Sequence, residues 1–223
     1  MATIQQLLEA HSKFVNAVEA LGAFDIVRRP LRASTAAEIA QLERALGVVV
    51  PADLRAFWEH GFENVSLCDG DAVIITETFV GAKGALESAE ITRKIAGDYP
   101  PSDPVELRWA QSGIPFHEGE DPCFIDAGKG GDGSVFQRIN DGDPLLDPVA
   151  KSFTEYFERW LGAGCYSYGK GDVKTFWKYW DRVRPCVPDP IEPGRNAWLL
   201  HHGKRYENPK FPGTGGAKKP KAR

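Results

Sequence analysis

The sequence lacks any run of about 18 apolar residues, the length at which a segment becomes a candidate for crossing a membrane as a helix. Its first 21 residues also lack the basic start and the unbroken apolar stretch of a secretory signal, because charged residues such as Glu9, Lys13 and Glu19 interrupt them. We therefore expect a cytoplasmic protein that makes no contact with a membrane.

Cysteine and histidine are both scarce, and their spacing fits none of the common metal sites. The four cysteines form no C-x-x-C pair and are expected to be buried thiols in a reducing compartment. His117, Cys123 and the adjacent pair His201 and His202 match no common zinc spacing, and adjacent residues of an extended segment point to opposite faces. The sequence therefore predicts no bound metal and no cofactor.

Familiar catalytic motifs are absent as well. The chain contains no G-x-S-x-G, H-E-x-x-H or C-x-x-C-H sequence, so no nucleophile, base and orienting group stand in a recognisable arrangement. The glycine-rich stretch 128–134 departs from phosphate-loop spacing, and a hairpin turn is the simpler interpretation. We expect a protein that is not an enzyme, with a hydrolase of unknown type as the least favoured alternative.

The chain does carry an uneven distribution of charge. It has 223 residues, 42% of them hydrophobic, and a formal net charge of −4. Segment 209–223 carries five basic residues and no acidic one, so removing these positive charges leaves −9 for the rest of the chain. Its composition predicts a basic, flexible tail. The acidic body favours a partner with a basic surface and predicts no specific affinity for nucleic acid.

Amphipathic patterns open the chain. Apolar residues at helical spacing between 4 and 21 predict a helix that Gly22 ends. Thr35 and Glu38 have capping-box spacing at the start of a second helix, and Gly47 is placed to end that helix in the left-handed conformation.

Further helices are indicated by proline, glycine and capping residues. A third helix begins at Pro51 and is closed by Gly61. Ser152 and Glu155 have capping-box spacing before an aromatic helix, and Asp172 is placed to cap the last helix. The side chains that we expect to be largely buried are Leu42, Leu54, Phe57, Phe153 and Phe157.

Strand-like segments gather in the middle of the chain. They are 72–76, 105–110, 114–116, 122–126 and 134–139, with a weak helix pattern at 86–96 and one more possible strand at 198–200. The segments 122–126 and 134–139 flank the glycine-rich stretch and predict a hairpin. Strands in the middle, with helices before and after them, predict an α+β fold.

Two groups of short motifs, in their order and spacing, resemble the Smi/Knr-like SUKH superfamily. The first is EIAQLERALG at 38–47 with VPADLRAFW at 50–58, followed by Gly61. The second is IPF at 114–116, CFID at 123–126, SVF at 134–136, VA at 149–150 and SFTEYF at 152–157. The resemblance implies a curved antiparallel sheet with helices packed on it.

The resemblance covers about residues 34–162 and leaves both flanks outside. It therefore predicts an N-terminal helical extension 1–33, a SUKH-like domain 34–162, an aromatic and proline-rich extension 163–208 and the basic tail 209–223.

The resemblance also implies a role. Many bacterial members of the superfamily resemble immunity proteins that bind and block polymorphic toxins, often nucleases, whereas fungal relatives resemble signalling scaffolds. Fold analogy alone does not determine function, so two interpretations stay open. The first is a non-catalytic immunity protein that neutralises a toxin with a basic surface. The alternative is a regulatory scaffold that uses the same domain to bind other proteins.

The candidate contact residues are acidic side chains in loops, because loops carry recognition and nucleases present basic grooves to phosphate. Trp177 leans away from the helix face that Phe176 and Trp180 share, so it is the candidate aromatic anchor. The simpler alternatives are a solvated acidic loop and an aromatic helix packed into the core. The predicted partner-binding residues are Asp69, Asp71, Glu118, Glu120, Asp121 and Trp177.

Overall fold

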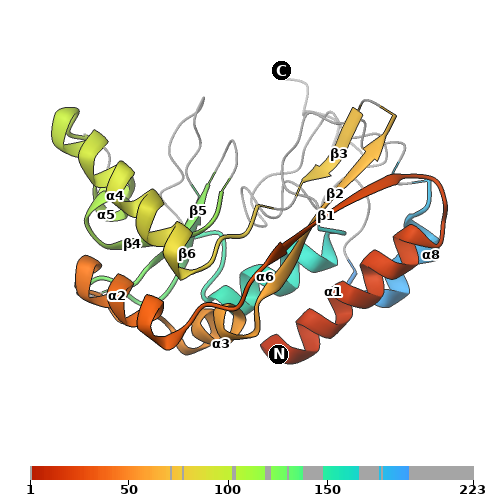
Figure 1. Ribbon diagram of the computed structural model, residues 1–223, viewed down its shortest axis with the longest axis horizontal. Helices are drawn as coiled ribbons and strands as arrows, with labels where there is room; N and C mark the ends of the chain where they lie inside the picture. The colour runs from red at the N-terminus through yellow and green to blue at the C-terminus, as the bar shows by residue number, and fades with distance from the viewer. Residues whose placement is uncertain are drawn as a thin grey trace, which may run out of the picture.

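The computed structural model describes residues 2–70, 72–76, 78–101, 104–118, 122–129, 131–137, 148–165, 176 and 178–190. In chain order its elements are α1 (Ile4–Glu19), β1 (Asp25–Leu31), α2 (Ala36–Leu46), α3 (Ala52–His60), β2 (Phe62–Asp69), β3 (Ala72–Thr76), α4 (Ala82–Asp98), α5 (Pro104–Ser112), β4 (Gly113–His117), β5 (Cys123–Asp126), β6 (Val135–Gln137), α6 (Phe153–Gly162), α8 (Trp180–Val183) and the 3₁₀ helix η1 (Arg184–Cys186). Figure 1 shows α4 and α5 at one end of the long axis, α1 and α8 at the other, and α6 between them. The predicted α+β class is confirmed.

Local caps start and stop the second and third helices where the sequence predicts. The Thr35 hydroxyl accepts from the Glu38 N–H at 3.2 Å, and the Glu38 carboxylate accepts from the Thr35 N–H at 2.8 Å. Gly47 ends α2 with a φ of 69°. Gly61 follows α3 with a φ of 80°, and a Cβ there would lie 2.9 Å from the Ala33 nitrogen. The turn after α3 therefore requires glycine for both conformation and space.

The first sheet has the order β1-β2-β3, with antiparallel pairs. β1 pairs with β2 along its whole length, from Asp25 opposite Cys68 to Leu31 opposite Phe62. The His11 ring of α1 lies 4.5 Å from the Phe62 ring, between centroids, so α1 packs against this sheet. Neither β1 nor β2 is predicted from the sequence.

The second sheet has the order β4-β5-β6 and contains the predicted hairpin of β5 and β6. Segment 78–80 joins it to the first sheet. The Phe79 N–H donates to the Asn64 side-chain oxygen, and the Asn64 amide donates back to the Phe79 carbonyl, each at 2.9 Å. On the other side, the Val80 N–H donates to the Phe116 carbonyl at 3.0 Å. The antiparallel strands thus form two three-stranded sheets linked by one short segment.

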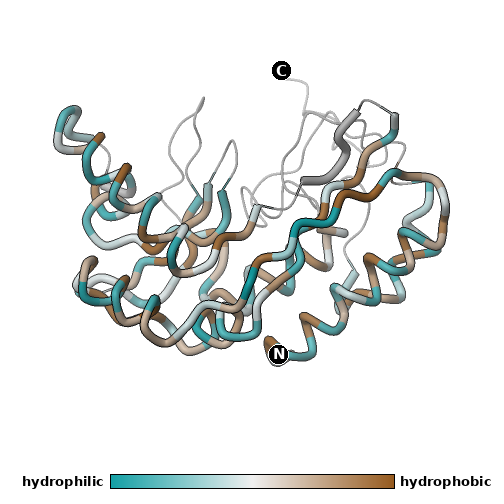
Figure 2. The backbone as a smooth tube through the Cα atoms, viewed as in Figure 1, coloured by the Kyte–Doolittle hydropathy of each residue, from teal (hydrophilic) through white to brown (hydrophobic). Residues whose placement is uncertain are grey.

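One large apolar core joins α1 and the segment around α8 to the middle of the chain, and a smaller cluster of Trp109, Phe124 and Phe136 lies apart from it. The five side chains expected to be buried, Leu42, Leu54, Phe57, Phe153 and Phe157, have no exposed surface, which confirms their placement. The same core includes apolar residues of α1 and, near the other end, Phe176, Trp180 and Val187. Figure 2 shows brown and teal residues alternating along α1, as expected for a helix with one buried face.

Several local predictions are wrong or incomplete. Segment 105–110 is not a strand but belongs to the helix α5, since Pro104 is tolerated in the first turn of a helix. The weak pattern at 86–96 is a longer helix, α4, and the first helix ends at Glu19 instead of residue 21. Ser152 caps the Glu155 N–H at 3.1 Å, but the Glu155 carboxylate accepts from the Lys151 N–H, so the capping box is half formed. The capping role of Asp172 and the strand at 198–200 lie outside the described residues.

Candidate protein-binding surface

Two of the predicted contact residues are described, and both are exposed at strand ends. Asp69 ends β2, where Gly70 turns the chain with a φ of 58°. Glu118 follows β4, and its N–H donates to the Thr78 carbonyl at 2.9 Å. Segment 78–80 meets β2 at Asn64, which lies five residues, or about 16 Å of strand, before Asp69. The other four predicted residues, Asp71, Glu120, Asp121 and Trp177, lie outside the described residues.

The residue before Glu118 is buried and belongs to a small polar cluster inside the core. The His117 ring stacks on Phe79 with centroids 4.3 Å apart, and its Nδ1 is hydrogen-bonded to the Tyr156 hydroxyl at 2.7 Å. The Cys123 thiol donates to the same hydroxyl at 3.4 Å. Burial lowers the pKa of His117 to about 3 and raises the pKa of Tyr156 well above its usual value. His117 and Tyr156 are therefore neutral and shielded from solvent, as structural core residues are.

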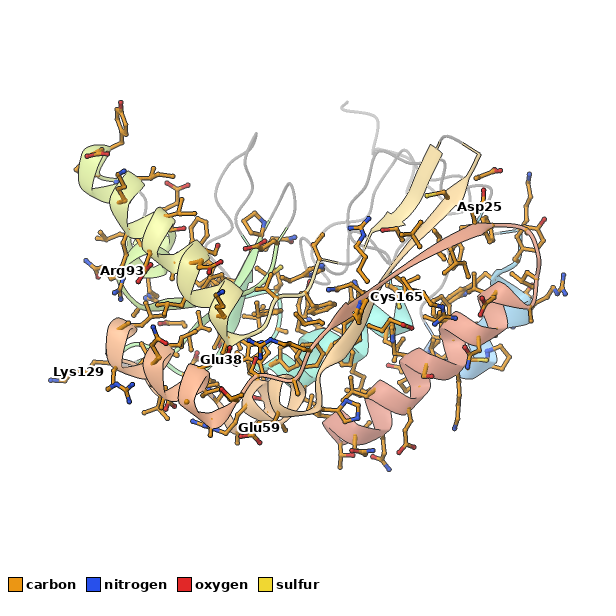
Figure 3. All side chains as sticks on the ribbon, viewed as in Figure 1. Asp25, Glu38, Glu59, Arg93, Lys129 and Cys165 are labelled. Atoms are coloured by element: carbon orange, nitrogen blue, oxygen red, sulfur yellow. The ribbon has the colours of Figure 1, made fainter. Side chains whose placement is uncertain are left out.

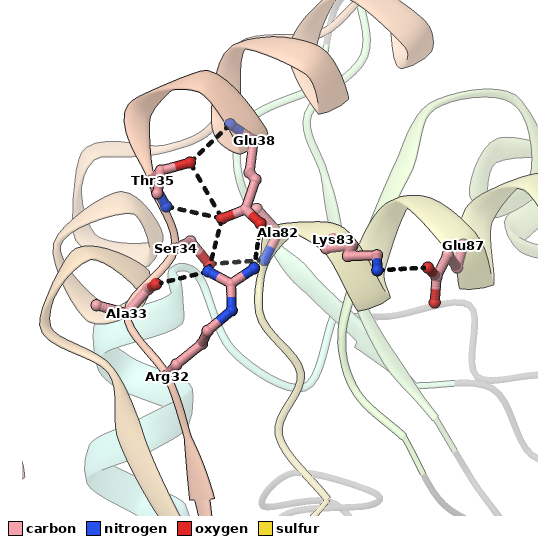
Figure 4. A network of polar contacts seen from close by, with 8 residues as sticks. All are labelled: Arg32, Ala33, Ser34, Thr35, Glu38, Ala82, Lys83 and Glu87. Carbon is pink, nitrogen blue, oxygen red and sulfur yellow. Dashed lines mark hydrogen bonds and ion pairs between the residues drawn. The ribbon is translucent and has the colours of Figure 1, made fainter.

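A polar network at the start of α2 also has a structural role (Figure 4). The Arg32 guanidinium donates to both carboxylate oxygens of Glu38, and this contact lowers the pKa of Glu38 to about 2. The Ser34 hydroxyl accepts from the Ala82 N–H at 3.0 Å. The network therefore ties the N-terminal ends of α2 and α4 to the linker that follows β1.

A cleft of about 410 Å³ lies between α1 and the neighbouring ends of β1 and α3. Its polar lining includes Ser12, His60 and Glu63. Glu63 is already paired with Arg28. Among the described residues, no three His, Cys, Asp or Glu side chains gather closely enough to hold a metal ion. The cleft is therefore lined partly by hydrogen-bonding groups.

Comparison with known families assigns the middle of the chain. Residues 33–159, more than half of the sequence, match the SMI1 / KNR4 family (SUKH-1). The chain belongs to this family. No curated protein matches the sequence. The match confirms the resemblance found in the motifs, and SMI1 / KNR4 domains are generally of a non-catalytic, immunity-protein type.

The matched region does not include every element that packs around it. It starts at Ala33, before α2, and ends at Arg159 inside α6. The helix α1 and the segment around α8 lie outside this region but share its core. Within the described part of the chain, no helix is long and apolar enough to cross a membrane.

One feature of this family member was missed by sequence reasoning. The hairpin of α4 and α5 exposes apolar side chains beside a groove of about 250 Å³. Ile95 and Tyr99 line this groove from α4, and Trp109 lines it from α5. A signal was present, because α4 carries Ile91 and Ile95 on the side opposite to its buried residues Ala85 and Ala89.

Proposed function

We propose that this SMI1 / KNR4 family member is a non-catalytic binding protein that neutralises a bacterial toxin by direct contact. The observation that carries the proposal is the family match over residues 33–159, since such domains are generally of the immunity type. The charge of −9 outside segment 209–223, together with the exposed carboxylates of Asp69 and Glu118, supports a toxin with a basic surface. A nuclease that holds phosphate in a basic groove fits this description.

The interior of the described region supports binding in preference to turnover. The two buried groups with shifted pKa values, His117 and Tyr156, are held neutral beneath the surface. The arginine–carboxylate pairs of Arg28 with Glu63 and of Arg32 with Glu38 hold neighbouring elements together. The proposed action is therefore stoichiometric, with the protein covering the active site or substrate groove of the toxin.

Affinity capture from the native cell tests the proposal. The tagged full chain should retain a protein with a toxin domain in a defined stoichiometry, and adding the purified chain should abolish the activity of that toxin. Mass spectrometry identifies the retained protein. A regulatory scaffold would instead retain non-toxin proteins, and cells lacking this chain would then survive production of any toxin encoded beside it.

Charge reversal then locates the contact. Asp69→Lys and Glu118→Lys should slow association with the captured toxin and flatten its salt dependence, because rim charges act mainly on encounter. Glu59→Lys is the matched control, since Glu59 is also an exposed acid but lies on the α3 side of the molecule (Figure 3). The series extends to Glu120→Lys and Asp121→Lys. Unchanged association for the folded multiple variant would exclude these positions from the interface.

A further inference from the structure

The strand β1 has one edge that pairs with no other strand among the described residues. It is the outer strand of the first sheet, whose order is β1-β2-β3, and Figure 1 shows it beside β2. Ile26 and Leu31 are half-buried, and the other residues of β1 are exposed. The edge of an exposed strand offers N–H and C=O groups to which a further strand can bond. β1 is therefore a candidate interface.

The position of Pro30 indicates which backbone groups point to this edge. Proline has no N–H, and a strand tolerates it where its nitrogen faces away from the hydrogen-bonded neighbour. Pro30 lies opposite Glu63 in the pairing with β2. Alternate residues of a strand direct their N–H and C=O groups to the same edge, so Ile26 and Arg28 point to the free edge together with Pro30. A further strand can therefore bond to Ile26 and Arg28, and Pro30 limits the pairing at the end of β1.

The side chains of Asp25, Val27 and Arg29 share one face of β1, because side chains alternate along a strand. This face is opposite α1, since Arg28 on the other face is paired with Glu19 of α1 at 2.7 Å. Val27 is 47% exposed. Asp25 and Arg29 are exposed too, and within the described part of the chain neither forms an ion pair. The face therefore presents an acid, an apolar side chain and a base at alternate positions.

This pattern is complementary to itself about Val27. When two copies of β1 pair antiparallel with Val27 opposite Val27, Asp25 of each copy lies opposite Arg29 of the other. The Cβ atoms of opposed residues are about 4.5–5.5 Å apart, and opposite charges at that distance attract. The same register places Ile26 of each copy opposite Arg28 of the other, and these are the residues whose backbone groups point to the free edge. One register therefore suits the side chains and the backbone together.

Other registers and other partners fit this edge less well. Centring the pairing on Arg28 places two guanidinium groups opposite each other, and centring it on Ile26 moves Asp25 away from Arg29. The charges of the edge do not select a basic or an acidic partner, because Arg28 is already paired with Glu19 and Glu63 and the charges of Asp25 and Arg29 cancel. A second copy uses both of the remaining charges.

We infer that β1 is a homodimer interface, at which two copies of this chain pair antiparallel about Val27 and join their first sheets into one. The two-fold axis passes between the two Val27 side chains, on the face opposite α1. The contact is limited to residues 25–29 of each copy, so the dimer is weak and forms as the protein concentration rises. This inference goes beyond the proposed function, because it concerns the chain alone and does not depend on a toxin.

Sedimentation equilibrium of the full chain tests the inference. The molar mass should rise from 24.6 kDa toward twice that value as the concentration increases. Asp25→Arg and Arg29→Asp each replace attractive contacts between the copies with repulsive ones, so each should weaken dimerisation by about tenfold, or about 1.4 kcal/mol. The double variant Asp25→Arg/Arg29→Asp restores the pairs in the opposite order and should dimerise like the wild type. Glu59→Lys, at an exposed acid on α3, is the control that should leave dimerisation unchanged.

Disulfide crosslinking locates the two-fold axis. Val27 faces its own copy in a pair whose Cα atoms are about 4.5 Å apart, which is within the range of a disulfide. Mild oxidation of Val27→Cys should therefore link two chains, and a reductant should separate them. Asp25→Cys is the matched control, because this exposed residue of the same face lies opposite Arg29 instead of its own copy. It should link no faster than the wild type, whose native cysteines set the background.

Several results would overturn the inference. One is a wild-type chain that stays monomeric up to a concentration of about 1 mM. Others are a dimer that the single charge reversals leave unchanged, a double variant that does not regain dimerisation, and equal crosslinking at positions 25 and 27. A monomer whose β1 amides are protected from hydrogen exchange by a strand of another protein would identify that strand as the occupant and would also exclude the homodimer.

Discussion

The buried imidazole of His117 should make the stability of this protein sensitive to mild acid. Its ring lies against Phe79, Tyr156 and Trp160, with centroids 4.3, 6.0 and 6.1 Å away, and none of these groups carries a charge. Burial alone therefore lowers the pKa of His117 from 6.5 to about 3. The unfolded chain binds one more proton than the folded chain between these two values. The free energy of unfolding consequently falls as the pH drops through this window.

The size of the effect follows from the two pKa values. A histidine with a pKa of 6.5 when unfolded and about 3 when folded contributes almost its full stabilisation at pH 7. Relative to pH 7, about 2 kcal/mol is lost at pH 5 and about 3 kcal/mol at pH 4. Typical domains have only about 5–15 kcal/mol of stability, so this single group has a measurable effect.

Urea unfolding, followed by tryptophan fluorescence between pH 7 and pH 4, isolates this contribution when wild type is compared with His117→Phe. The substitution removes the hydrogen bond to Tyr156, which changes the free energy of unfolding by the same amount at every pH. It also removes the titrating group. The difference in the free energy of unfolding between the two proteins should therefore change by about 3 kcal/mol from pH 7 to pH 4. His60→Gln, at an exposed histidine, should retain the pH dependence of the wild type. Parallel curves for wild type and His117→Phe would refute the reasoning.

Three further outcomes are expected. Phe57→Ala should lose about 3–5 kcal/mol, measured by thermal unfolding, because Phe57 is fully buried among other aromatic rings; a variant with an unchanged melting temperature would disprove its place in the core. Arg93→Lys should lose about 2 kcal/mol in urea unfolding, since one ammonium group cannot reach the carbonyls of two helix ends, whereas Lys94→Arg should be neutral. Elemental analysis of the purified chain should find no stoichiometric metal, and about one zinc ion per chain would contradict the prediction.

Features that depend on neighbouring residues could be predicted from the sequence. The capping box of Thr35 and the helix stop at Gly47 involve contacts within a few residues, so their motifs alone identify them. β1 could not be predicted in this way. Its sequence, DIVRRPL, is largely exposed, and it forms an edge strand, where proline is tolerated because only one side of the strand is paired.

The error at α5 has a different cause. Val105, Leu107 and Trp109 alternate with polar residues, which is the pattern of a half-buried strand. In the helix, Trp109 is buried while Leu107 is 43% exposed. The groove between α4 and α5 was missed for another reason, because an apolar residue in a sequence pattern is assigned to the core. Of the two described contact residues, Glu118 lies in a loop as predicted, whereas Asp69 is the last residue of β2 and not a loop residue. The distance between them depends on how the two sheets meet.

The core that unites α1 with α6, α8 and η1 has a consequence for the order of events during synthesis. The buried face of α1, which includes Leu7 and Phe14, leaves the ribosome first, but Trp160, Phe176 and Val183, which belong to the same core, are synthesised more than 140 residues later. At a synthesis rate of roughly 5–20 residues per second, the buried face of α1 exists for on the order of ten seconds before these packing partners have been synthesised. Chaperone binding to nascent chains should therefore concentrate on residues 4–18 and end once residue 187 has emerged.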